Sequence, residues 1–291
     1  MTGIIDAHTH IWDRRTGDYT WLTAEYGPIH RDFALEDFAH EREQLGVDAV
    51  VLVQAADTAG DTDRMLTAAE RHREVAGVVA WLPLADAELP RVLEQRLATR
   101  RVVGVRALVH EMADREWLLR SDVAAGLDAV AAAELPFDLV TSGPEALSLV
   151  PRLVERHPTL RIVIDHLGKP PVGGDAESFA RWRALLRDAA ASPRVAAKLS
   201  GLASAVGSPD AWTVAGLRPV VDEAVEAFGA ERLMYGGDWP VSMLAGGCTR
   251  VFEGLHEALD VSADELAHIH RGTATRWYRL GERAKDETRT P

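Results

Sequence analysis

The sequence predicts a single α/β domain folded as a distorted (β/α)8 TIM barrel, and three observations lead to that prediction. Short apolar runs rich in β-branched residues recur eight times along the 291 residues. Stretches with apolar residues at helical spacing separate most of these runs, and no linker or internal repeat interrupts the alternation. Eight strands alternating with helices over this length are typical of such a barrel. A doubly wound open sheet is the alternative, but no glycine-rich phosphate-binding turn follows the first run, which disfavours it.

The eight runs are short and apolar, as parallel strands covered on both faces are. In order they read GIIDA from residue 3, AVVLVQ from 49, VAGVVAWL from 75, VVGVRAL from 102, PFDLV from 136, LRIVID from 160, RVAAKLS from 194 and RLMYGGD from 232. Between them, residues 61–75, 143–158 and 217–231 carry the apolar spacing of amphipathic helices. We expect the barrel to occupy residues 1–281 and a polar C-terminal tail to occupy residues 282–291.

The composition limits which classes of partner the protein is expected to bind and indicates the compartment in which it is expected. A formal net charge of −13 disfavours nucleic acid and anionic membranes, because both bind basic surfaces. No apolar run reaches the length of a membrane span, and no cationic leader precedes the first strand, so we expect a cytoplasmic protein. The single cysteine, Cys248, excludes an intrachain disulfide and a multi-cysteine zinc site. A small-molecule substrate is compatible with all of these observations.

The connection after the first strand, residues 11–48, is unusually long for a compact domain. Long connections of this kind are usually functional, and this one follows the carboxyl end of a barrel strand. It predicts either a lid over a pocket or an aromatic cluster that packs over the barrel mouth. The aromatic residues that suggest both are Trp12, Tyr19, Trp21, Tyr26 and Phe33.

Two pairs of histidines stand two residues apart, and only one pair has a geometry suited to a shared ligand. His8 and His10 follow a predicted strand, on which residues i and i+2 share one face. His268 and His270 follow a capping-box pattern in a predicted helix, where residues i and i+2 point to different sides. The first pair is therefore the candidate for metal or substrate binding.

Polar residues also stand at the predicted carboxyl ends of several other strands, where barrel enzymes carry their chemistry. Taken singly, these residues have structural explanations. Asp165 or Lys198 is explained as a partner in a structural ion pair, and Arg106 as a side chain that links neighbouring strands. Taken together, they predict one site at the barrel mouth. The set is His8, His10, Gln54, Arg106, Asp165, His166, Lys198, Ser200 and Asp238.

Four segments make a family resemblance specific: DAHTHIWD from residue 6, DHLGKP from 165, KLSGL from 198 and YGGDWPVS from 235. The chain resembles the lactonase branch of the amidohydrolase superfamily, which includes sugar-acid lactonases and 2-pyrone-4,6-dicarboxylate lactonase. Weaker matches extend the resemblance over nearly the whole chain. The resemblance implies a distorted (β/α)8 barrel, in agreement with the strand count.

By the same resemblance, His8 and His10 match the first-strand histidines, His166 the sixth-strand histidine, and Asp238 the eighth-strand aspartate that activates water. One departure concerns the fifth strand, where FDLVTSG from residue 137 lacks the usual histidine or bridging lysine. A two-metal site is therefore not expected. The cofactor is either none or a single divalent ion such as Zn²⁺ on His8, His10 and Asp238.

We therefore expect a hydrolase that opens a small sugar-acid lactone by direct attack of a water activated by Asp238. His8, His10 and His166 would hold the carbonyl oxygen or the water, directly or through a metal. Ser200 lies outside a G-x-S-x-G turn, so no acyl-enzyme is expected. The residues expected to bind substrate are Arg106, Trp81, Gln54, Trp12 and Lys198.

Two alternatives stay open at this point. The first is a metal-dependent decarboxylase of the same superfamily, which the missing fifth-strand histidine disfavours. The second is a non-catalytic barrel that binds a sugar acid, which the retention of Asp238 beside three histidines disfavours.

Overall fold

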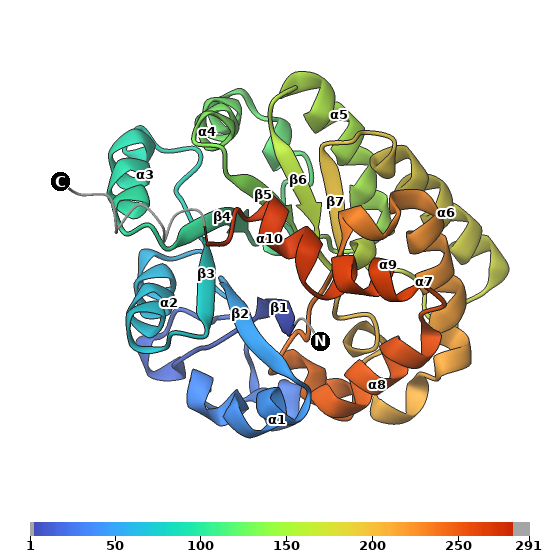
Figure 1. Cartoon of the computed structure of the whole chain (residues 1–291). Helices are drawn as coiled ribbons and strands as arrows, with labels where there is room; N and C mark the ends of the chain where they lie inside the picture. The colour runs from blue at the N-terminus through green and yellow to red at the C-terminus, as the bar shows by residue number, and fades with distance from the viewer. Residues whose placement is uncertain (1–2, 282–291) are drawn as a thin grey trace.

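The protein, described here as a computed structural model over residues 3–281, is an eight-stranded parallel barrel whose strands neighbour one another in chain order (Figure 1). The predicted barrel is therefore confirmed over the open sheet. The strands are β1 (Ile4–Thr9), β2 (Val47–Val53), β3 (Val75–Ala80), β4 (Val102–Ala107), β5 (Pro136–Leu139), β6 (Arg161–Ile164), β7 (Val195–Leu199) and β8 (Leu233–Tyr235).

The barrel closes through the segment that follows β8 rather than through β8 itself. Thr9 at the end of β1 forms an isolated parallel bridge with Trp239. The backbone N–H of His10 donates to the carbonyl oxygen of Trp239 at 2.7 Å, and the N–H of Asp238 donates to that of His8 at 2.8 Å. The last strand is short because two glycines and a left-handed Asp238 follow it, and this irregular closure is the distortion of the barrel.

Helices surround the strands, and several begin at residues suited to that position. The side chains of Thr58, Asp175 and Thr213 each accept a hydrogen bond from the backbone of the helix they precede. The helices are α1 (Ala39–Gln44), α2 (Ala59–Arg71), α3 (Leu89–Ala98), α4 (Ser121–Ala132), α5 (Leu149–Arg156), α6 (Ala176–Ala190), α7 (Val214–Phe228), α8 (Cys248–Ala258), α9 (Ala263–Ala267) and α10 (Thr273–Trp277).

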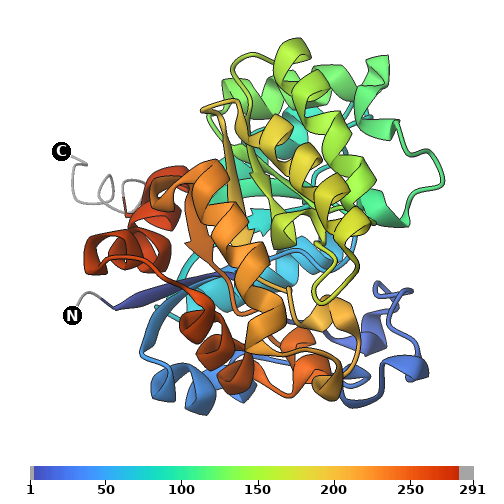
Figure 2. The ribbon, with the colours of Figure 1, turned by 90° about the vertical axis from the view of Figure 1, so that its right-hand side faces the viewer.

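The C-terminal helices cover one end of the barrel. Figure 1 shows α9 and α10 lying across the ring of strands, and Figure 2 shows them at the opposite end from the blue segment that follows β1. Trp277 and Tyr278 pack among interior residues of the strands, such as Val51 and Val163. The other end, where the strands terminate at their carboxyl ends, is therefore where a site is expected. The predicted tail at 282–291 lies outside the described residues.

The predicted capping box at Ser262 and Glu265 is present at the start of α9. The helix continues through one π-turn at His268–Gly272, in which His270 approaches His256 rather than His268, with the two Nε2 atoms 2.5 Å apart. Among residues 3–281, no helix combines the length and apolar character that crossing a bilayer requires.

Candidate active site

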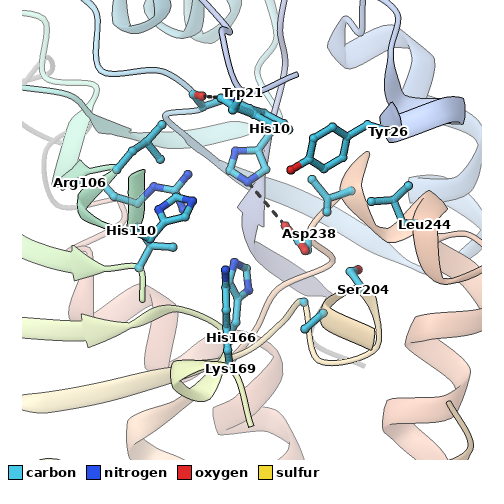
Figure 3. Close-up of a pocket in the computed structure, with 16 residues that line it drawn as sticks. His10, Trp21, Tyr26, Arg106, His110, His166, Lys169, Ser204, Asp238 and Leu244 are labelled. Atoms are coloured by element: carbon cyan, nitrogen blue, oxygen red, sulfur yellow. Dashed lines mark hydrogen bonds and ion pairs between the residues drawn. The ribbon is translucent and has the colours of Figure 1, made fainter. Parts of the chain in front are cut away.

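A cavity of about 220 Å³ opens at the carboxyl ends of the strands (Figure 3). Its lining residues are of two chemical kinds. The apolar residues are Trp21, Ala55, Leu108, Val140, Val241 and Leu244. The polar residues include His10, Arg106, His110, His166, Lys169, Ser204 and Asp238. A ligand that carries both oxygens and apolar carbon matches this lining.

His8, His10 and Asp238 form the innermost cluster. Nε2 of His8 lies 3.1 Å from Nε2 of His10, and Oδ1 of Asp238 lies 3.8 Å and 3.6 Å from these two atoms. Asp238 has a left-handed backbone, φ +52°, which is rare for a residue with a side chain and is typical of functional positions. The N–H of Asp238 is held by His8, so this strained turn fixes the carboxylate at the cavity floor.

Asp6 connects the two chain segments that carry this cluster. Its Oδ1 accepts hydrogen bonds from the backbone N–H of His8 at 2.9 Å and of Gly237 at 2.8 Å. The side chain is fully buried, and burial raises the pKa of Asp6 to about 6. Sequence reasoning missed Asp6, although a carboxylate inside the apolar run IIDA was a signal of a buried partner.

His166 lies beside His8, with ring centroids 4.6 Å apart, and also has a left-handed backbone, φ +54°. Its Nδ1 lies within hydrogen-bonding distance of Oγ of Ser200, at 2.9 Å. Burial lowers the pKa of His166, so the imidazole is neutral at pH 7. Gly201, φ +60°, lets His166 and Asp238 pack directly against the backbone, because a Cβ there would overlap Nδ1 of His166 and lie 2.9 Å from Oδ2 of Asp238.

Arg106 reaches the cavity from β4 with its guanidinium held on two sides. Nη1 donates to Oδ2 of Asp165 at 2.9 Å, and Nη2 donates to the backbone oxygen of Gln54. The Nε–H is buried and has no hydrogen-bond acceptor within the described part of the chain. Because Arg106 lines the cavity, this fixed cation is suited to attracting an oxygen of a ligand.

A fully buried ionic network lies beneath these residues, inside the barrel. Nζ of Lys198 lies 2.6 Å from Oδ2 of Asp138 and 3.0 Å from Oδ1 of Asp165. The hydroxyl of Tyr278 also donates to Oδ2 of Asp138, at 2.7 Å. Burial raises the pKa of Asp165, but Lys198, His8 and Arg106 together outweigh burial and hold the pKa well below its usual value of 3.8. Asp138, on β5, is therefore a structural carboxylate. It lies two residues before Val140, the first of the residues that stand in place of the expected fifth-strand histidine.

The His8, His10 and Asp238 cluster fits one metal ion. A point equidistant from the two Nε2 atoms and Oδ1 lies about 2.0 Å from each of them, which matches zinc–ligand distances of about 2.0–2.2 Å. Among the described residues, it is the one group of three histidine, cysteine or acidic side chains with metal-ligand spacing. The donor set, two imidazoles and a carboxylate, is one that catalytic zinc sites use.

Four residues predicted to bind substrate do not line the cavity. Trp12 is buried, and its indole N–H donates to the backbone of Arg31. Trp81 lies in a separate surface groove. The fully buried side-chain amide of Gln54 donates to Asp57 and to the backbone of Arg106, and Lys198 belongs to the ionic network.

The aromatic residues of the long connection after β1 divide between the core and the cavity. Trp12, Tyr19 and Phe33 are buried in the core. Trp21 and Tyr26 line the cavity, with their rings in an edge-to-face contact at 5.4 Å, and the indole of Trp21 donates to the backbone oxygen of Ala55 at 2.7 Å. Figure 3 shows both at the side of the cavity opposite His166.

Three polar residues of the cavity, His110, Lys169 and Ser204, were not predicted. Lys169 lies within the quoted DHLGKP segment, so the motif contained it, but the direction of its side chain depends on the left-handed residues 166–169. His110 and Ser204 lie in irregular connections after β4 and β7, where no periodicity indicates which side chains face inward.

Comparisons with known proteins identify the family. The Amidohydrolase family model matches residues 5–280. The chain is 34% identical over 294 residues to an L-fucono-1,5-lactonase of Burkholderia ambifaria, with 99% of both chains covered. It is 34% identical to an L-fucono-1,5-lactonase of Burkholderia multivorans, with 96% and 97% covered. A crystal structure of an amidohydrolase from Burkholderia multivorans with bound zinc superposes with a TM-score of 0.88 at 31% identity, covering 96% of this chain and 100% of that one. The resemblance predicted from the four sequence segments is therefore confirmed, and the chain belongs to the amidohydrolase family.

Proposed function

We propose that the protein is a lactonase that hydrolyses the 1,5-lactone of a small sugar acid. The observation that carries the proposal is the carboxylate of Asp238, held by a strained turn in a cavity whose other polar groups include three histidines and two cations. The 34% identity to two L-fucono-1,5-lactonases over nearly the whole chain supports the same reaction class.

In the proposed reaction, Asp238 is the general base. Its Oδ1 faces His8 and His10, whereas Oδ2 faces Gly201 and the ring of His166. A water in the cavity beside Asp238 loses a proton to this carboxylate while its oxygen attacks the lactone carbonyl carbon. A tetrahedral intermediate forms, with a negative charge on the former carbonyl oxygen.

Buried donors stabilise that charge. Arg106 lines the cavity, and its guanidinium is already held by Asp165 and Gln54, so it does not need to reorganise to stabilise this charge. When the intermediate collapses, the bond to the ring oxygen breaks, and the proton held by Asp238 passes to that oxygen. The product is the open hydroxy acid, with one water consumed.

His8, His10 and Asp238 would hold a divalent ion, which when bound supplies a Lewis acid and lowers the pKa of a bound water. The chain's own residues provide a base and a donor in either case. The rate of lactone hydrolysis with and without a chelator therefore measures what the ion contributes, and the same residues act in the metal-free and metal-bound forms.

The apolar lining residues suggest which sugar acids fit. Leu108, Val241 and Leu244 present carbon to the cavity among its polar groups. A 6-deoxy sugar acid places a methyl group where other sugars carry a hydroxyl, and burying a methyl against these side chains contributes about 0.8 kcal/mol. We therefore propose a 6-deoxyaldono-1,5-lactone, of the kind that L-fuconolactone represents, as the preferred substrate class.

The test is a screen of aldono-1,4- and 1,5-lactones and pyrone carboxylates with a pH indicator, run with and without chelator. We expect proton release with 1,5-lactones, and a higher kcat/KM for 6-deoxy members than for their 6-hydroxy counterparts. Background rates over the whole panel would remove the lactonase assignment. Equal rates for the 6-deoxy and 6-hydroxy pairs would remove the substrate class alone.

The decarboxylase alternative is not favoured, because the full-length relatives at 34% identity are named lactonases. The same screen separates it from the proposal, since a decarboxylase releases carbon dioxide from an acid and opens no ring. A non-catalytic barrel would bind a lactone without turnover.

A further inference from the structure

Lys198 contacts His8, a member of the His8, His10 and Asp238 cluster, as well as the carboxylates of the ionic network. Its ammonium carries three hydrogens, and three acceptors surround it: Asp138 Oδ2 at 2.6 Å, Asp165 Oδ1 at 3.0 Å and His8 Nδ1 at 3.1 Å. Lysine only donates, so a hydrogen bond to His8 requires a lone pair on Nδ1. A neutral His8 then carries its hydrogen on Nε2, which lies 3.1 Å from Nε2 of His10. Nη1 of Arg106 is farther from the same atom, at 3.4 Å, and donates to Asp165 at 2.9 Å instead.

His10 leads to the same assignment independently. Its Nδ1 lies 2.8 Å from the carbonyl oxygen of Val53, which only accepts, so the hydrogen of a neutral His10 is on Nδ1 and Nε2 is bare. The Nε2 atoms of the two rings lie 3.1 Å apart. A hydrogen bond between them needs one hydrogen, and His8 is the ring that supplies it.

A metal ion changes this arrangement. Coordination through Nε2 of His8 needs a lone pair there, so the hydrogen must be on Nδ1 instead. The acceptor available to Nδ1 is then Oδ1 of Asp165, 3.3 Å away, and Lys198 loses one of its three acceptors. All of these groups are fully buried, so water cannot replace the lost contact.

We propose that Lys198 is a positioning residue that sets the tautomer of His8, and that it thereby weakens the affinity of the His8, His10 and Asp238 cluster for a divalent ion. The inference deepens the proposed function, because it assigns Lys198 as the residue that shifts the site from the metal-bound toward the metal-free form. Lysine at the end of β7 then has a role beyond the charge pairing that the ionic network requires.

The experiment follows the histidine ring nitrogens by long-range ¹H–¹⁵N NMR in the metal-free protein. The wild type is expected to show His8 with a protonated Nε2 and a bare Nδ1, and His10 with the opposite tautomer. His8→Asn and His10→Asn variants assign the signals. In the double variant Lys198→Met/Asp138→Asn, which removes one positive and one negative charge together, His8 is expected to turn to the Nδ1–H tautomer facing Asp165.

The second readout is Zn²⁺ affinity, measured by competition with a chelator. We expect binding roughly tenfold tighter in the double variant, the scale of effect that partners of metal ligands have. Tyr278→Phe is the matched control: it removes a hydrogen bond to the same oxygen of Asp138 but leaves the contact between Lys198 and His8 in place. It should leave both the tautomer and the Zn²⁺ affinity unchanged.

A wild-type His8 that carries its hydrogen on Nδ1 overturns the proposal, and this result needs no variant to fold. A folded double variant with unchanged tautomer and unchanged Zn²⁺ affinity overturns it as well, as does an equal change in Tyr278→Phe. Neither readout uses a lactone, so failure of the proposed function leaves this test intact.

Discussion

Oδ1 of Asp238 lies 3.6 Å from Nε2 of His10, close enough for electrostatic attraction but longer than a hydrogen bond. The carboxylate is therefore positioned by its backbone more than by this partner. Replacing Asp238 with asparagine keeps the shape and the backbone contacts but removes the base. We expect kcat to fall by roughly a hundredfold or more, with the melting temperature little changed.

Both quantities should be measured on one preparation of Asp238→Asn. A large loss of stability would indicate a buried ion-pair role for the carboxylate. A variant that keeps substantial kcat would exclude Asp238 as the base and leave the reaction to the histidines.

Metal content is expected to reach at most one divalent ion per chain. One cluster fits an ion, and the fifth strand provides Val140, Thr141 and Ser142 at its end in place of a second set of ligands. Elemental analysis after growth with added zinc measures the stoichiometry, and His10→Asn should abolish the bound ion. Two tightly held ions per chain would contradict the single-site geometry.

Trp21 is expected to bind substrate, whereas Trp81 is not. Trp21 lines the cavity and Trp81 lies in a separate groove. Removing an aromatic face of this size typically costs about 1–1.5 kcal/mol, or roughly tenfold in KM. Trp21→Ala should raise KM by that amount with a smaller effect on kcat, and Trp81→Ala should leave KM unchanged. Steady-state kinetics on both variants distinguish them, and equal effects would contradict the cavity lining.

Gly201 lets His166 and Asp238 lie against the backbone of residue 201. Gly201→Ala should lower kcat by roughly a hundredfold, because the new methyl would overlap Nδ1 of His166, lie 2.9 Å from Oδ2 of Asp238 and displace both side chains. Gly207→Ala is a matched control, since Gly207 also has a positive φ, +80°, but no atom within 4 Å of an added Cβ. Both variants carry backbone strain, but only Gly201→Ala should lose activity. Full activity in Gly201→Ala would show that catalysis does not depend on the positions of these two side chains.

Asp6 is expected to make stability depend on pH. Its pKa rises from 3.8 to about 6 on folding because the charged form is buried. The folded state therefore binds the proton more tightly, and the stability that this proton contributes is present below pH 3.8 and lost as the pH rises through 6.

Asp6→Asn keeps an oxygen for the N–H groups of His8 and Gly237 and removes the buried charge. The melting temperature of the variant relative to wild type should therefore increase from about pH 4 to pH 7. Calorimetry at several pH values measures the difference. A difference that is constant across this range would show that Asp6 does not titrate there.

The strand order followed from the sequence because each strand is a short apolar run, and burial on both faces requires such runs. Agreement was weakest at β8. The run RLMYGGD predicted a strand to residue 238, but the strand ends at Tyr235, because the two glycines and the left-handed Asp238 belong to the closing turn. That turn is a product of contacts with β1, which lies more than 220 residues away.

The candidate site, like the fold, was predicted in part from the sequence. His8, His10, His166, Arg106 and Asp238 meet because strand ends converge in any such barrel, and this convergence is visible from spacing alone. Trp12 and Trp81 follow strands as well, but their side chains turn away. Trp81 is tied to α2 through its backbone N–H and Thr62. The direction of a side chain in a loop depends on tertiary contacts of this kind, and no local pattern contains them.

The link between Asp6 and Gly237 has a practical consequence for protein engineering. The histidines belong to the first strand and the base follows the eighth, so neither half of the chain contains a working site. If the chain is divided in the exposed connection at residues 113–116, activity should return only when the two fragments reassemble and the first strand meets the closing turn. Lactone hydrolysis would then report fragment complementation, because the site forms only where the first strand of one fragment contacts the closing turn of the other.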